Sequence, residues 1–153
     1  MRLTPLPLLT AALLLSSAFV LRADDVKEIT LHTDPVNPLG YAKESKSFTV
    51  KAGDKVKVNL ENKSPLPHNI LIVKPGALQK VGALANGMLT DPNAMAKDYI
   101  PESPDILFHT KLIQPTKVGT LEFTAPAEPG DYPYLCTFPG HWMLMQGIMK
   151  VEK

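Results

Sequence analysis

SFTVKAGDKVKVNLEN, residues 47–62, alternates apolar and polar residues more strictly than any other part of the chain. Apolar residues alternate with polar ones on both sides of a turn at 52–54, and the alternating positions are Phe48, Val50, Val56, Val58 and Leu60. This period of two is typical of half-buried β-strands. The stretch therefore predicts two strands joined as a β-hairpin.

Six further segments are predicted as strands because they alternate in the same way or form short apolar runs. They are VKEITLHTD (26–34), HNILIVKP (68–75), DILFHTKLI (105–113), GTLEFTAP (119–126), DYPYLCTF (131–138) and GIMKVEK (147–153). Residues 76–98 contain few β-branched residues, which favours one or two short helices broken at Gly87 and Pro92. The sequence predicts an all-β, antiparallel Greek-key β-sandwich of seven to eight strands, with a short helical insert between strands four and five.

The first 23 residues differ from the rest of the chain. Arg2 is followed by the apolar run LPLLTAALLLSSAFVL, and the chain then becomes acidic at Asp24. This order predicts a secretory signal peptide at 1–23, followed by a single domain at 24–153 in a periplasmic or secreted protein. The alternative is an uncleaved segment that acts as an anchor. The apolar run is short of a full membrane crossing, which favours the signal peptide over the anchor. After cleavage we expect no membrane span.

Composition excludes several classes of function. Of 153 residues, 44% are hydrophobic and 20% charged, as in ordinary globular proteins. Without residues 1–23 the chain has 14 basic and 15 acidic residues, a net charge of −1, so nucleic acid is not an expected partner.

The single cysteine, Cys136, cannot form an intrachain disulfide. It is therefore a buried thiol, half of an intermolecular bridge, a nucleophile or a metal ligand.

CTFPGHWMLM, residues 136–145, offers a thiol, an imidazole and a thioether within one short loop. His141 follows Cys136 by five residues and Met145 follows His141 by four. A turn at 138–141 can direct these side chains towards one centre, and His68, at the start of another predicted strand, can supply a second imidazole. Two imidazoles, one thiolate and a weak thioether are the ligands of electron-transfer copper. A Cys–His nucleophile pair is the alternative, but no orienting group or oxyanion motif accompanies it.

CTFPGHWMLM together with PHN at 67–69 resembles the small blue copper proteins, the cupredoxins, and specifically the azurin and auracyanin branch. The segment 97–113 is similar to the azurin segment that leads into its fifth strand, and ANGM at 85–88 falls in that family's helical flap. The resemblance implies an eight-stranded Greek-key β-sandwich with one type 1 copper ion. It also implies one-electron transfer between periplasmic or membrane-bound redox partners, without enzyme activity.

The resemblance implies a role for each residue of the loop and its surroundings. His68, Cys136 and His141 would be the equatorial copper ligands, Met145 the distant axial ligand, and the carbonyl of Pro67 a weak contact on the opposite side. Around them, Asn69 and Thr137 would join the two ligand loops by hydrogen bonds, with Phe138 beside them. The chain departs from azurins in lacking a disulfide near the N-terminus, and in carrying Trp142 where azurins have a small residue.

An apolar surface patch is expected around the edge of His141, where electrons would leave the protein. It would contain Leu66, Pro139, Trp142, Met143 and Leu144, with Phe138 beside them and Met88 as a weaker candidate. The alternative for Trp142 is a plain core position.

We expect a monomer that docks redox partner proteins weakly and transiently. A copper chaperone is the rival function. A copper enzyme would need a second metal site, for which only His32 and His109 remain.

Overall fold

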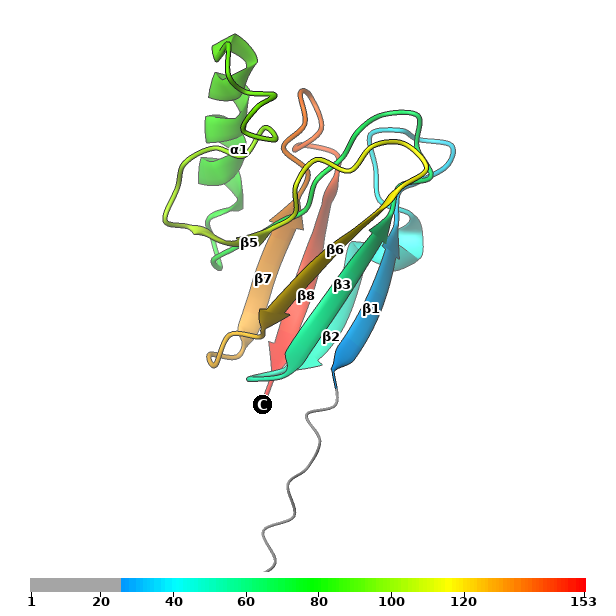
Figure 1. Ribbon diagram of the computed structural model, residues 1–153. Helices are drawn as coiled ribbons and strands as arrows, with labels where there is room; N and C mark the ends of the chain where they lie inside the picture. The colour runs from blue at the N-terminus through cyan, green and yellow to red at the C-terminus, as the bar shows by residue number, and fades with distance from the viewer. Residues whose placement is uncertain (1–25) are drawn as a thin grey trace, which may run out of the picture.

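The computed structural model describes residues 26–153, which form two packed β-sheets and one helical insert (Figure 1). The eight strands are β1 (Lys27–His32), β2 (Ser47–Lys51), β3 (Lys55–Glu61), β4 (Leu71–Val73), β5 (Ile106–His109), β6 (Val118–Thr124), β7 (Gly130–Leu135) and β8 (Gln146–Glu152). The helices are η1 (Lys43–Lys46), α1 (Leu78–Gly87) and η2 (Met88–Thr90). The predicted all-β sandwich, with its insert between the fourth and fifth strands, is confirmed.

The strands divide into a three-stranded sheet, β1-β3-β6, and a five-stranded sheet, β2-β8-β7-β4-β5. Two pairings are parallel: β1 with β3, and β2 with β8. The sandwich predicted as antiparallel therefore contains two parallel pairings beside its antiparallel ones. Alternation of side chains indicates a strand but carries no information about the direction of its neighbour.

The predicted hairpin at 47–62 is wrong, although both of its strands form. β2 pairs with β8, whereas β3 pairs with β1 and β6, so the turn between β2 and β3 crosses from one sheet to the other. Gly53 takes a φ of 81° in this turn, and its N–H donates to the carbonyl of Ala125. The apolar faces of β2 and β3 meet through the core instead of lying side by side in one sheet.

The main core lies between the two sheets. β3 buries every second residue, and Val56, Val58 and Leu60 are at most 1% exposed. β4 is buried along its whole length but spans only three residues, so the apolar run at 68–75 overstated the strand. Cys136 and Met145 belong to this same buried cluster; Cys136 directly follows β7 and Met145 directly precedes β8.

The helical insert packs on the outside of the five-stranded sheet. The helix α1 begins at Leu78, ends at Gly87 as predicted, and continues as η2 before a series of turns through Pro92. Figure 1 shows α1 (green) at the same end of the molecule as the orange-to-red loop that follows β7. The buried face of α1 carries Val81 and Ala85, and it forms a second, smaller core.

The predicted signal peptide at 1–23 lies outside the described residues. Within residues 26–153, no helix has the length and apolar character needed to cross a membrane.

Candidate metal centre

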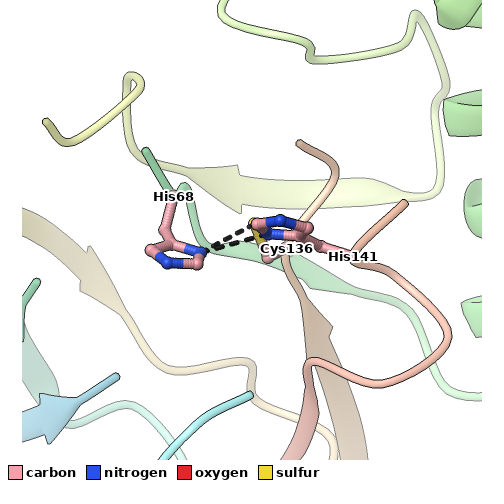
Figure 2. A group of neighbouring side chains, drawn as sticks. All are labelled: His68, Cys136 and His141. Carbon is pink, nitrogen blue, oxygen red and sulfur yellow. Dashed lines mark hydrogen bonds between the residues drawn. The ribbon is translucent and has the colours of Figure 1, made fainter. Parts of the chain in front are cut away.

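Three side chains from two distant parts of the chain meet at the end of the sandwich. The Nδ1 atoms of His68 and His141 are 3.2 Å apart, and the Sγ atom of Cys136 lies 3.7 Å from the first and 3.5 Å from the second. Figure 2 shows His68 facing Cys136 and His141 across a narrow gap. All three residues are at most 1% exposed. Among the described residues they form a group of donor atoms compact enough to hold one metal ion.

His68 is fixed by its backbone before β4 begins. Its N–H donates to the carbonyl of Ile113 at 3.0 Å, and its own carbonyl accepts from the N–H of Ile113 at 2.6 Å. The buried amide of Asn62 supports both sides of this bridge, because its Nδ2 donates to the carbonyls of Ile113 and Leu66. Asn62 and Ile113 were not predicted from the sequence, because no local pattern indicates contact between residues 51 positions apart.

Cys136 and His141 belong to the loop between β7 and β8. Cys136 follows the last residue of β7, and its N–H donates to the carbonyl of Met145 at 3.1 Å. The predicted turn is present, because the N–H of His141 donates to the carbonyl of Phe138 and Gly140 has a φ of 81°. The N–H of Met145 then donates to the carbonyl of His141 at 2.8 Å, forming one helical turn.

The predicted hydrogen bond between Asn69 and Thr137 is present and joins the two segments. The Oδ1 of Asn69 accepts from the N–H of Thr137 at 2.8 Å, and its Nδ2 donates to the Oγ1 of Thr137 at 2.9 Å. The same Nδ2 also donates to the carbonyl of Asp98, a residue held at a φ of 54°. This third connection, which the sequence did not indicate, ties the helical insert to the histidine and cysteine segments.

Burial keeps the three donors uncharged at neutral pH. Desolvation lowers the pKa of His68 to about 4, with a smaller contribution from His141, and desolvation also lowers the pKa of His141 to about 4. Burial raises the pKa of the Cys136 thiol to about 12, although backbone N–H groups of Asn69 and Phe138 favour the thiolate. The metal-free site therefore contains two neutral imidazoles and a protonated thiol at neutral pH.

This donor set fits copper better than other common metals. A thiolate selects soft or borderline ions, and neutral imidazole suits both oxidation states of copper. Met145 is fully buried beside the group and could add a thioether. The Nδ1 atom of His68 faces the other two donors. The Nε2 atom of the same ring is buried without a hydrogen-bond partner among the described residues. The axial role of the half-buried Pro67 stays a prediction.

Five of the residues predicted for the surface patch are exposed or half-buried. Met143 and Leu144 are 63% and 60% exposed. Leu66, Phe138 and Pro139 are half-buried.

Trp142 is only 9% exposed, so its assignment to the surface patch is wrong. Its side chain packs against α1, as the alternative core position required. Met88 is buried as well. The expected exposed edge of His141 is absent, because that residue is 1% exposed and the Phe138 ring lies 5.0 Å from its ring.

Comparison with known proteins agrees with this geometry. A family model described as copper binding proteins, plastocyanin/azurin family, matches residues 33–152. Azurin-1 from Alcaligenes xylosoxydans xylosoxydans is 32% identical over 83% of this chain and 87% of its own length. Auracyanin-A from Chloroflexus aurantiacus is 35% identical over 69% of this chain, and the match spans 64% of that protein's length.

Solved structures give the same result. Auracyanin A, a "blue" copper protein from Chloroflexus aurantiacus, superposes with a TM-score of 0.73 at 32% identity, covering 83% of this chain and 99% of that one. Auracyanin from Roseiflexus castenholzii superposes with a TM-score of 0.70 at 37% identity, covering 83% and 98%. The resemblance inferred from the sequence is confirmed. The chain belongs to the plastocyanin/azurin family of copper-binding proteins.

Proposed function

We propose that this chain is a type 1 copper protein that carries single electrons between redox partners. The observation that carries the proposal is the convergence of two neutral imidazoles and one thiol at a buried point, in a member of a copper-binding family. Blue copper relatives with a similar fold support the same function. The chain acts as a carrier and not as an enzyme, because a fully enclosed set of ligands leaves no position for a substrate.

Each ligand atom has a proposed role. The Nδ1 atoms of His68 and His141 and the Sγ atom of Cys136 would hold copper. Met145 would supply a weak thioether, and the Pro67 carbonyl would be a further weak donor. The backbone N–H groups of Asn69 and Phe138 stabilise the thiolate and so influence the reduction potential.

The protein frame is suited to repeated electron exchange. Copper supplies the chemistry when bound, by cycling between Cu(II) and Cu(I) with the gain and loss of one electron. The ligand segments are held by the Ile113 bridge, by the Asn69–Thr137 bonds and by the turn from His141 to Met145, none of which depends on a metal. A frame held in this way limits rearrangement of the ligands during each cycle.

Partners would dock at the end of the molecule that carries the ligand loop. Met143 and Leu144 are exposed there, with Leu66 and Pro139 half-buried. This small apolar patch carries no charged side chain of its own and suits a brief, weak encounter between a monomer and its redox partner. Export to the periplasm or beyond follows from the signal peptide proposed at 1–23, and residues 24–153 then form one copper-binding domain.

Voltammetry of the copper-loaded protein tests the function. We expect one reversible one-electron wave, and electron exchange with a soluble redox partner that is much faster than exchange of copper with a chelator. Copper exchange faster than electron exchange would instead identify a copper chaperone. Turnover of a substrate by the copper-loaded protein would identify an enzyme. Either of these two results would overturn the proposal.

A further inference from the structure

Trp142 directly follows His141, but its side chain packs in a different core from the side chains of Cys136 and Met145. It belongs to the smaller core between the five-stranded sheet and α1, whereas Cys136 and Met145 belong to the main core. Leu135 and Cys136 divide in the same way, with Leu135 in the smaller core. The chain around the metal centre therefore separates two cores, and α1 covers the outer one.

The helix is shaped to receive the indole of Trp142. A Cβ atom added to Gly82 would lie 2.2 Å from Cε3 of the indole, so the helix backbone touches the ring directly. Four residues later on the same face of α1, the Oδ1 of Asn86 accepts a hydrogen bond from the indole Nε1 at 2.8 Å. A close contact and a directed hydrogen bond together fix both the position and the orientation of the indole.

The backbone of Trp142 lies within the turn that carries the ligands. The N–H of Met145 donates to the carbonyl of His141, and the Nε2 of Gln146 donates to the carbonyl of Trp142 at 2.7 Å. A displacement of the indole therefore cannot stay local. It would rotate the turn that aims the ring of His141 and the thioether of Met145.

We propose that Trp142 is a positioning residue for the metal centre, and that α1 braces the ligand loop through it. Gly82 and Asn86 form the receiving surface on the helix. The proposal rests on the copper site proposed above, and it assigns to the insert a task within that site. The brace would hold the side chains of His141 and Met145 in a fixed orientation. This would slow copper release and keep the Cu(II) hyperfine splitting in the EPR spectrum narrow.

The substitution Gly82→Ala tests the brace, and Gly87→Ala is its matched control. Both glycines belong to α1, and a Cβ at Gly87 would meet nothing within 4 Å, whereas a Cβ at Gly82 collides with the indole. Trp142 is the only tryptophan in the chain, so its fluorescence reports directly on the contact in metal-free protein. The copper-loaded protein is followed by EPR and by the rate of copper release to a chelator.

We expect Gly82→Ala to increase quenching of Trp142 by acrylamide without metal, to change the Cu(II) hyperfine splitting, and to speed copper release to the chelator by about 10- to 100-fold. Gly87→Ala should match the wild type in all three measurements. If Gly82→Ala exposes the indole while the EPR spectrum and copper release stay unchanged, Trp142 is only a core residue and the proposal is overturned.

Trp142→Phe provides a second test should Gly82→Ala fail to fold. It removes the indole N–H and the outer ring, and we expect copper release to become faster than in the wild type. Wild-type copper release in Trp142→Phe would also overturn the proposal. A wild-type protein without a blue copper spectrum would instead refute the proposed function, so the two failures are distinguishable.

Discussion

Copper(II) binding at pH 7 should release one proton for each copper ion bound. Burial raises the pKa of the Cys136 thiol to about 12, so at that pH the metal-free protein carries it as the protonated thiol. His68 and His141 have pKa values lowered to about 4, so both are already neutral and release nothing. Since copper binds the thiolate, the proton of Cys136 must leave.

The pH dependence of copper affinity follows from the same values. Between about pH 6 and pH 9 the affinity should rise tenfold per pH unit, because one proton competes with the metal. Below about pH 4 the slope should steepen towards three protons, as His68 and His141 also become protonated. A histidine of ordinary pKa would bring this steeper region up to about pH 6.5.

Titration calorimetry under anaerobic conditions measures the release directly. Heats recorded at pH 7 in buffers of different ionisation enthalpy give the number of protons from their slope. Cys136→Ala is the control and should release none at this site. A release of zero from the wild type would mean that Cys136 is a thiolate already or does not bind copper. A release near three would mean that the imidazoles of the metal-free protein are charged. Either value would refute this account of the burial of the site.

Three further substitutions probe the surroundings of the centre. Met145→Leu should keep copper bound and raise the reduction potential, measured by voltammetry, because the oxidised state loses a weak electron donor. Asn69→Ala should lower the free energy of unfolding of the metal-free protein by about 3 kcal/mol in denaturant titrations, because the buried Thr137 and the partly buried carbonyl of Asp98 lose their hydrogen bonds. Tyr41→Phe should leave that free energy unchanged or raise it by about 1 kcal/mol, because the buried hydroxyl has no partner within residues 26–153.

Each of these substitutions has an outcome that contradicts its reasoning. An unchanged potential in Met145→Leu would show that this thioether is not axial. A loss below about 1 kcal/mol in Asn69→Ala would mean that the ligand segments hold together without the amide. A loss above about 1 kcal/mol in Tyr41→Phe would reveal a partner for the hydroxyl.

The part of the site that lies within one loop could be predicted from the sequence. The spacing of Cys136, His141 and Met145, with a proline and a glycine between the first two, largely determines how the loop folds back. His68 could be found because it precedes an apolar strand next to two prolines. Local chemistry was sufficient in both cases.

Contacts between distant segments could not be predicted in the same way. β2 and β3 show the same alternation, yet they belong to different sheets, because strand pairing depends on partners such as β8 about a hundred residues away. Trp142 was assigned to the surface because nothing near it indicates Gly82 or Asn86, which receive it. The left-handed backbone at Asp98 could not be predicted either, because that conformation usually indicates glycine and residue 98 is an aspartate.

His68, Cys136 and His141 should bind one copper ion together. The most direct test is the visible and EPR spectrum of the protein after Cu(II) is added, beside the variant Cys136→Ser. We predict intense blue absorption from thiolate-to-copper charge transfer, with a narrow hyperfine splitting, and the loss of both in the variant. A pale, ordinary Cu(II) spectrum that Cys136→Ser leaves unchanged would place the metal elsewhere and contradict the account.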